Sequence, residues 1–215
     1  MMTDFCNEAC GICREINGLT SIQGYESIVR EKNNIIAESD SFIIIPSIGP
    51  LNASHVMLVP KWHVNSFAAL DDECKSESRK ILSLLNEYSI KQFGFPLIFF
   101  ESGAGETIDH SGGCIFHAHI HCVSYTRVFE TALNKEIEFK SVGTHSSEYD
   151  VQGGYVWYMN PSYKEFLCNK PLLPSQFLRY LYSDSNLIRG SWNWRRDYNI
   201  SGVLEVIEKY KGFKL

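Results

Sequence analysis

Residues 117–123 read His-Ala-His-Ile-His-Cys-Val, so three histidines alternate with small or apolar residues. Successive side chains of a β-strand project to opposite faces of a sheet. The alternation therefore predicts a strand over 114–123 with three imidazoles on one face and apolar side chains on the other. The chain has seven histidines in 215 residues. Three at this spacing indicate a chemical use more than a solvated strand face.

Two uses of the imidazoles are open from these residues alone. In the first, His117, His119 and His121 ligate a metal ion together. In the second, one imidazole is a nucleophile and its neighbours bind and protonate the reacting groups. Histidine suits both uses, because its protonation changes near neutral pH.

The sequence around this stretch predicts strands and one long helix. Apolar runs bounded by turn residues predict strands at 26–46 (short strands), 55–60, 96–101 and 153–159. Helical spacing of apolar residues predicts helices at 71–93, 174–183 and 201–212. Asp71, Pro174 and Ser201 stand where these helices would begin. The expected fold class is α+β, with an antiparallel sheet and one long helix over 1–125 and a mixed C-terminal extension over 126–215 packed on it.

Composition limits the function classes. The chain is 44% hydrophobic and 21% charged, which is ordinary for a globular protein. Its formal net charge of -5 argues against a nucleic-acid partner held by long-range attraction. No apolar run is long enough to cross a membrane, and the polar N-terminus does not read as a signal peptide. We therefore expect a cytoplasmic protein without a membrane partner.

Three of the seven cysteines lie in the first 13 residues. Cys10 and Cys13 have the Cys-x-x-Cys spacing of half a zinc site. In a reducing compartment such a cluster indicates a metal more than a disulfide. Two free thiols are the alternative, and Cys6 is a further candidate ligand.

The chain resembles the histidine-triad superfamily in three blocks. Residues 117–123 resemble its signature of three histidines alternating with hydrophobic residues. Residues 52–63, NASHVMLVPKWH, resemble its upstream strand with a leading histidine and a Pro-Lys-x-His ending. Residues 10–18, CGICREING, resemble the Cys-x-x-Cys start of some members. The order and spacing of the blocks match over 10–125, so the resemblance implies the histidine-triad fold.

The resemblance also implies a role for each histidine. His119 would attack the α-phosphorus of the substrate and form a phosphohistidine. His121 would bind phosphate oxygens or protonate the leaving group, and His55 would support the nucleophile. Backbone N–H groups of the preceding loop would bind the phosphate, with Gly112 and Gly113 allowing its close approach.

A structural zinc ion is implied as well. The resemblance gives it four ligands: Cys10, Cys13, His63 and His117. Two thiolates and two imidazoles close a tetrahedral site, so such a zinc would be structural. His119 and His121 would then remain available for chemistry.

The sequence departs from the family pattern at two substrate-binding positions. Cys114 stands where the family has a phosphate-binding serine, and a thiol is the poorer donor. Ser47 stands where many members carry a ribose-binding aspartate. We therefore expect a weaker preference for ribose than in a typical member. His121 is retained where the transferase branch has glutamine, which favours hydrolysis over transfer.

Two blocks of the extension resemble tails of histidine-triad-like proteins, PSQFLRYL at 174–181 and SWNWRRDY at 191–198. Gln176 and Arg179 lie three residues apart, and Arg195 or Arg196 could bind an anion. The tail either packs through its tryptophans with solvated arginines, or closes over the substrate and sets its identity. Gln176 and Arg179 are the candidate substrate-binding residues of this part.

The expected function is a hydrolase acting on the α-phosphate of a nucleotide-like or phosphate-ester substrate. Alternatives are a nucleotidyltransferase, an enzyme whose metal is catalytic, and a nucleotide-binding protein of the same fold with little turnover. The expected partner is a nucleotide or phosphorylated small molecule. We also expect a homodimer, which the resemblance implies.

Overall fold

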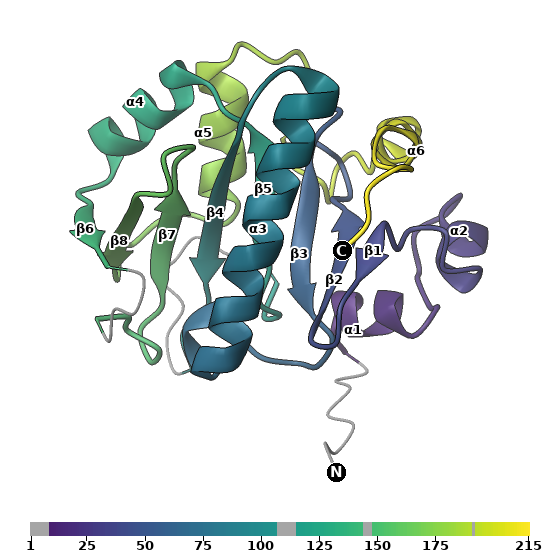
Figure 1. The fold of residues 1–215 in the computed structure, drawn as a ribbon, viewed down its shortest axis with the longest axis horizontal. Helices are drawn as coiled ribbons and strands as arrows, with labels where there is room; N and C mark the ends of the chain where they lie inside the picture. The colour runs from purple at the N-terminus through teal and green to yellow at the C-terminus, as the bar shows by residue number, and fades with distance from the viewer. Residues whose placement is uncertain (1–8, 107–114, 144–147, 191) are drawn as a thin grey trace.

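An eight-stranded antiparallel sheet organises the computed structural model, which describes residues 9–106, 115–143, 148–190 and 192–215 (Figure 1). The strand order is β1-β2-β3-β5-β4-β7-β8-β6. The strands are β1 (Ala37–Glu38), β2 (Phe42–Pro46), β3 (Val56–Pro60), β4 (Leu97–Gly103), β5 (Ile120–Ser124), β6 (Lys140–Val142), β7 (Tyr155–Met159) and β8 (Glu165–Asn169). The expected α+β class with an antiparallel sheet is confirmed.

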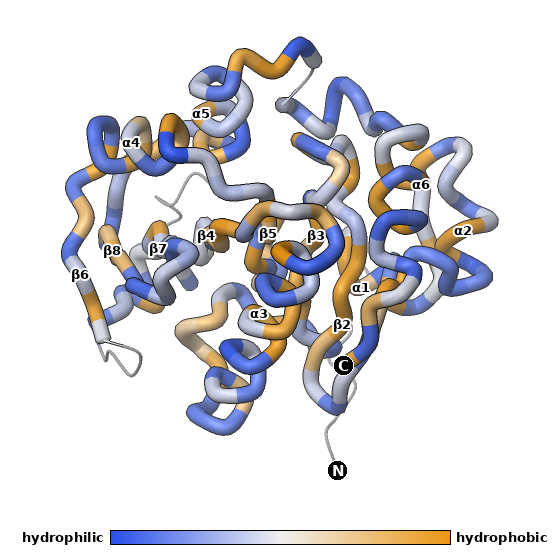
Figure 2. Tube along the Cα trace, turned by 45° about the horizontal axis from the view of Figure 1, so that its top comes forward, coloured by the Kyte–Doolittle hydropathy of each residue, from blue (hydrophilic) through white to orange (hydrophobic). Residues whose placement is uncertain are grey.

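Helices cover both faces of this sheet, which is why its central strands are apolar on both sides. The helices are α1 (Gly11–Ile16), α2 (Glu26–Arg30), α3 (Asp72–Phe93), α4 (Arg127–Glu136), α5 (Phe177–Ser185) and α6 (Ile200–Lys209), with a short 3-10 turn at Phe67–Ala69. Helix α3 lies on one face, and α4 and α5 lie on the other (Figure 2). None of the helices in the described part of the chain is both long and apolar enough to span a membrane.

Helix α3 is the long helix expected from the sequence, and both of its ends are capped. The Asp71 side chain accepts a hydrogen bond from the Cys74 N–H at 2.8 Å. Gly94 ends the helix in the left-handed region at φ 80° and donates its N–H to the Ile90 carbonyl. The apolar stripe that includes Ile81 and Leu85 is buried against the sheet.

Several expected elements differ in the structure. Glu26–Arg30 is one helical turn rather than a strand, and five residues are too few to show a helical period. Helix α6 begins after Asn199, whose side chain accepts from the Gly202 N–H, so Ser201 is not its cap. Helix α5 begins at Phe177, after Gln176 in a left-handed conformation.

The strand of the histidine stretch is shorter than expected, since β5 begins at Ile120 and the residues before it follow another path. The Ala118 N–H donates to the Val64 carbonyl at 2.7 Å, and the His117 carbonyl accepts from the His119 side chain. These two backbone groups do not take part in hydrogen bonds between strands, so His117 and His119 lie before the strand. Ala118, Ile120 and Cys122 still share one buried face.

The C-terminal extension continues the same sheet. Strand β7 pairs with β4 in a register that runs from Phe99↔Met159 to Gly103↔Tyr155. In the last helical segment, the Tyr210 hydroxyl donates to the Ser54 carbonyl at 3.0 Å. The sheet therefore crosses the expected boundary near residue 125, and a division into two units stays a prediction.

Glu101 of β4 carries a carboxyl group that is buried on the α3 side of the sheet. Glu101 is 2% exposed and accepts hydrogen bonds from the Phe67 N–H at 2.9 Å and the Tyr155 hydroxyl at 2.6 Å. Burial raises the pKa of Glu101 to about 7, against the lowering effect of these two donors. The nearby Arg79 guanidinium is paired with a different carboxylate, that of Glu165, at 3.0 Å.

We predict that Glu101→Gln flattens the pH dependence of stability between pH 5 and 8. The folded state holds the Glu101 proton up to about pH 7, whereas an unfolded chain releases it near 4.5. The folded state binds more protons in this window, so raising the pH lowers the free energy of unfolding, by about 1–3 kcal/mol from this group. Urea unfolding at several pH values measures the slope. Glu106→Gln, an exposed control beyond β4, should keep the wild-type slope, and an unchanged slope in Glu101→Gln would contradict the assignment.

Candidate active site

Two histidines lie side by side where β5 begins. Residue His121 pairs in register with Met57 of β3 and with Phe100 of β4, so it stands at the centre of the sheet. His119 lies just before the strand, and its ring centroid is 4.8 Å from that of His121. Both are nearly buried, with 7% and 8% exposure.

Hydrogen bonds fix the proton positions on His55 and His121. The Leu51 N–H donates to His55 Nδ1 at 3.0 Å, so a neutral His55 carries its proton on Nε2. That Nε2–H donates to His121 Nδ1 at 2.8 Å. His121 Nδ1 is then an acceptor, and the His121 proton lies on Nε2. His121 is thereby a neutral N–H donor, and His55 contacts His121 rather than His119.

The neighbouring His119 has the opposite tautomer. Its Nδ1 lies 2.6 Å from the His117 carbonyl oxygen, which can only accept. Nδ1 therefore carries the proton and Nε2 carries the lone pair. A lone pair on one imidazole thus lies beside an N–H donor on the next, which is the pair of groups that nucleophilic attack at phosphorus requires.

Burial keeps these imidazoles uncharged. Desolvation lowers the pKa of His119, and it lowers the pKa values of His55 and His121 well below the usual range. The positive charge of Arg179 adds to the lowering at all three rings. A neutral imidazole needs no deprotonation before it attacks, so this environment suits a nucleophile.

The two histidines line a cavity of about 440 Å³. Its wall is built by helix α1, the turn after β2 and the C-terminal segment around residues 194–198. The lining residues that carry hydrogen-bonding or charged groups include Arg14, Glu15, Ser47, His63, Arg179 and Arg195. A volume of this size accommodates a nucleotide-sized ligand.

The C-terminal segment is tied to this wall by a buried guanidinium group. Arg179 is 4% exposed and donates from Nη1 to Ser47 Oγ at 3.0 Å and from Nε to the Trp192 carbonyl at 2.9 Å. Its Nη2 donates to the Gly49 carbonyl. One side chain therefore joins the turn after β2 to the tail, and the tail lines the cavity.

Gly49 shows how closely the tail packs on that turn. Its N–H donates to the Tyr198 carbonyl at 2.8 Å. A Cβ at this position would lie 2.8 Å from the Asp197 carbonyl oxygen, and the residue has a φ of 60°. Glycine is thus required both by the backbone conformation and by the approach of the tail.

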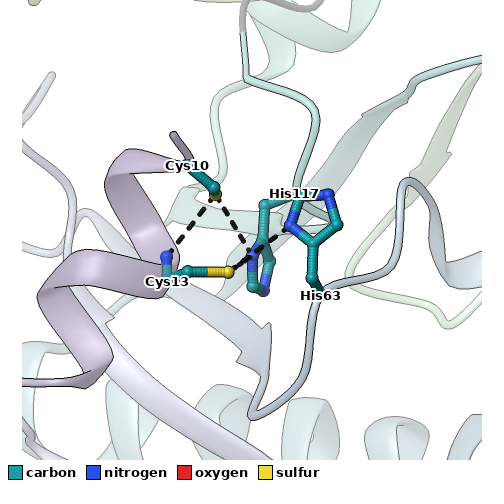
Figure 3. A group of neighbouring side chains, drawn as sticks. All are labelled: Cys10, Cys13, His63 and His117. Atoms are coloured by element: carbon teal, nitrogen blue, oxygen red, sulfur yellow. Dashed lines mark hydrogen bonds between the residues drawn. The ribbon is translucent and has the colours of Figure 1, made fainter. Parts of the chain in front are cut away.

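A cluster of two cysteines and two histidines adjoins the cavity, and its Cys10 and His63 are among the cavity-lining residues. Figure 3 shows how the four side chains lie together. Its members are Cys10, Cys13, His63 and His117, whose ligand atoms all lie within 4.8 Å of one another. Cys13 Sγ is 3.4 Å from Nδ1 of both His63 and His117, and Cys10 Sγ is 3.5 Å from His117 Nδ1. Tetrahedral zinc bonds would place nitrogen and sulfur ligands about 3.5 Å apart. The four residues therefore fit a zinc ion.

His117 is oriented for this cluster by its other ring nitrogen. Nε2 donates to the Pro60 carbonyl at 3.0 Å, which leaves the lone pair on Nδ1 facing the two sulfur atoms. Cys10 also caps helix α1, since its Sγ accepts from the Cys13 N–H at 3.5 Å. The short helix thus presents both thiols to the histidines.

The other predicted substrate-binding residues have different outcomes. Gln176 is buried and donates to Asn193 Oδ1 at 3.1 Å, and it is not among the cavity-lining residues of the described chain. Arg195 lines the cavity, whereas Arg196 does not. The predictions for Gly112, Gly113 and Cys114, like the candidate ligand Cys6, lie outside the described residues.

Sequence reasoning missed the contribution of helix α1 to the cavity. Arg14 and Glu15 follow Cys13 directly and line the cavity beside the cluster. The Cys-x-x-Cys spacing could have indicated this, because residues that directly follow such a pair on a short helix are held near the metal ligands. The tail was expected either to pack through its tryptophans or to close over the substrate, and Trp194 lines the cavity.

The family described as "Protein similar to CwfJ C-terminal" matches residues 23–138, just over half of the chain. Similar solved structures include a HIT-like protein involved in cell-cycle regulation from Bartonella henselae, at 17% identity and TM-score 0.39, covering 48% of this chain and 75% of that one. A zinc-bound histidine-triad family protein from Mycobacterium smegmatis has 17% identity and TM-score 0.39, covering 47% and 73%. A HIT family protein from Bacillus anthracis has 17% identity and TM-score 0.44, covering 56% and 76%. No curated protein matches the sequence.

We predict that Arg179→Leu and Arg179→Lys both destabilise the protein, by about 2–4 kcal/mol, because each leaves buried carbonyl groups of the turn and the tail without their donor. Lysine does not restore the planar fork of donors. Chemical unfolding measures the loss, and limited proteolysis should show earlier cleavage in the tail. Arg189→Leu, at an exposed position after α5, is the control. Equal stability of Arg179→Lys and the wild type would contradict this role.

Proposed function

Since the chain belongs to the family of proteins similar to the CwfJ C-terminal region, within the histidine-triad superfamily, we propose that it hydrolyses a nucleotide-like or phosphate-ester substrate through a phosphohistidine on His119. One observation carries the proposal. The lone pair on His119 Nε2 and the N–H on His121 Nε2 belong to adjacent buried rings that line one cavity. A nucleophile and an oxyanion donor are thereby held together without a charge on either ring.

The chemistry follows from these tautomers. His119 Nε2 attacks phosphorus, a phosphorus–nitrogen bond forms, and the phosphorus–oxygen bond to the leaving group breaks. The ring becomes cationic, and its Nδ1–H keeps its hydrogen bond to the His117 carbonyl, which stabilises that charge. His121 donates from Nε2 to a phosphoryl oxygen. Water then attacks the phosphorus and the bond to His119 breaks. The proton that water loses passes, through solvent, to the oxyanion of the departed leaving group, and the neutral imidazole returns.

Hydrogen bonding favours a histidine nucleophile over a catalytic metal held by all three histidines. His119 Nδ1 is occupied by a carbonyl, and His121 Nδ1 is occupied by His55. His117 Nδ1 faces the cysteine thiols instead. The three rings therefore do not present a common set of lone pairs to one ion.

We further propose that the cluster of Cys10, Cys13, His63 and His117 holds a structural zinc ion. The donor set and its spacing support this proposal, as does the hydrogen bond that orients His117. Four protein ligands leave no open position, so the zinc would stabilise the attachment of helix α1 to the sheet. It would also fix the backbone of His117, whose carbonyl binds His119.

We predict that His119→Asn abolishes turnover of a phosphoanhydride or phosphoramidate substrate and leaves the fold intact, because asparagine cannot form the covalent intermediate. Activity should fall by at least about a thousandfold. Steady-state kinetics and circular dichroism measure the two effects. Trapping with labelled substrate should place the phosphoryl group on His119 in the wild type. Retention of more than a few per cent of activity would rule out the nucleophile.

We predict about one zinc ion per freshly purified chain, by elemental analysis, since the four ligands close one tetrahedral site. Cys13→Ser should lower the zinc content and the melting temperature, because binding of a structural metal contributes to folding. Cys74→Ser is the matched control, since Cys74 is a buried thiol outside the cluster. A protein without zinc, whose stability does not change on chelation, would refute the site.

A further inference from the structure

A second cavity, of about 290 Å³, lies on the α3 side of the sheet. Ile120 lines this cavity, whereas the next residue of β5, His121, lines the first one. Successive side chains of a strand project to opposite faces, so the two cavities lie on opposite sides of β5. None of the described residues that line the second cavity has a role in the proposed hydrolysis.

The Glu101 carboxyl group lines this cavity and lacks a positively charged partner. It accepts hydrogen bonds from two neutral donors, the Phe67 N–H at 2.9 Å and the Tyr155 hydroxyl at 2.6 Å. No lysine, arginine or histidine of the described chain forms an ion pair with it. A buried carboxylate without a counter-ion is costly, and burial accordingly raises the pKa of Glu101 to about 7. A cation bound in the cavity would supply the counter-ion.

The other buried carboxyl group at the cavity wall already has its partners. Glu165 Oε1 accepts from Arg79 Nε at 3.0 Å, and Glu165 Oε2 accepts from Arg79 Nη2 at 3.3 Å. Glu165 Oε2 also accepts from Trp157 Nε1 at 3.0 Å. The charges of Glu165 and Arg79 therefore balance each other within the wall, which leaves Glu101 as the buried carboxyl group that a cationic ligand could pair with.

Aromatic side chains form much of the wall around Glu101. Phe67, Tyr155 and Trp157 are buried and line the cavity. Tyr149 also lines it and packs edge to face on Tyr155, with ring centroids 4.8 Å apart. The faces of such rings attract organic cations, and the rings also accept the apolar part of a ligand. Ca²⁺ and Mg²⁺ need about six oxygen ligands or more, so this wall suits an organic cation better than a metal ion.

The rim of the cavity lies at the start of α3, where a ligand can enter. Asp72 is exposed and Lys75 is half-buried at this end, and both line the cavity. Their charges are opposite, so their effects on an approaching cation counteract each other. The buried Glu101 carboxyl group therefore decides which sign of charge the ligand should carry.

We propose that this second cavity binds a small protonated primary amine, whose ammonium group pairs with Glu101 and whose apolar part contacts Phe67 and Trp157. An ammonium group has three N–H donors, and a charged donor makes the stronger hydrogen bond to a carboxylate. The amine binds the ionised form of Glu101, so its binding releases the proton that burial retains. This site is separate from the proposed hydrolysis, and its test does not depend on turnover.

The test is a titration of the full chain, labelled with nitrogen-15, with n-butylamine and with 1-butanol, a neutral molecule of the same length. The indole N–H resonance of Trp157 reports on the second cavity, and that of Trp194 reports on the first. Three variants are compared with the wild type at pH 6 and pH 8. Glu101→Gln removes the carboxylate, and Ala68→Met fills the cavity but keeps the carboxylate. Glu73→Gln removes an exposed carboxylate of α3 that does not line the cavity.

At pH 8 we expect the amine to bind the wild type at least about tenfold more tightly than the alcohol, with a shift of the Trp157 resonance. Glu101→Gln should remove this preference, Ala68→Met should weaken binding of the amine, and Glu73→Gln should resemble the wild type. The proposal is overturned if the amine has no preference over the alcohol, if Glu101→Gln or Ala68→Met binds the amine as the wild type does, or if only the Trp194 resonance moves.

The pH dependence gives an independent check. Because the pKa of Glu101 is about 7 in the free protein, affinity for the amine should fall by about tenfold from pH 8 to pH 6. Burial raises the pKa values of Tyr149 and Tyr155, so these hydroxyls stay neutral over this range. Glu101→Gln should show no such fall, although it retains the other charged groups that line the cavity, which are Asp72, Lys75, Arg79 and Glu165. An equal fall in Glu101→Gln would overturn the pairing with Glu101.

Discussion

The site depends on His117, because this one residue connects three parts of the molecule. Its Nδ1 faces the thiols of helix α1, and its Nε2 donates to the Pro60 carbonyl at the end of β3. Its own carbonyl accepts from His119 Nδ1. The backbone carbonyl of His117 therefore decides the tautomer of His119. A change in the cysteine cluster would therefore reach the proposed nucleophile through this residue.

Burial without charge is the second constraint on the site. An imidazolium in this part of the sheet would lose solvation and would lie near the Arg179 guanidinium, so both effects favour the neutral ring. A neutral imidazole can act as donor or acceptor at a given nitrogen only if its tautomer is defined. Two successive hydrogen bonds, from the Leu51 N–H to His55 and from His55 to His121, define the tautomer of His121. The acceptor role of His121 Nδ1 thus originates in a backbone amide of the turn after β2.

The sequence predicted the parts of this arrangement that depend on local pattern. The long helix with its Asp71 cap and the central strands are readable from spacing and apolar runs, and they are confirmed. The sequence did not predict that His117 and His119 precede the strand, because their alternation with apolar residues is typical of a strand. The strand pairing ends there because the Ala118 N–H donates to the Val64 carbonyl, which is distant in the sequence. Pairing of Arg179 with Ser47 joins residues 132 positions apart, and no local pattern encodes such a contact.

Ser47 and the tail are best understood together. The resemblance to histidine-triad proteins places a carboxylate at this position, yet here the Arg179 guanidinium lies 3.0 Å from the serine hydroxyl. An aspartate beside this arginine would form an ion pair and cancel much of its charge. Serine instead accepts the hydrogen bond and leaves the charge in place. The Ser47 hydroxyl therefore leaves a cationic group in the cavity wall, and Arg195 of the tail lines the same cavity.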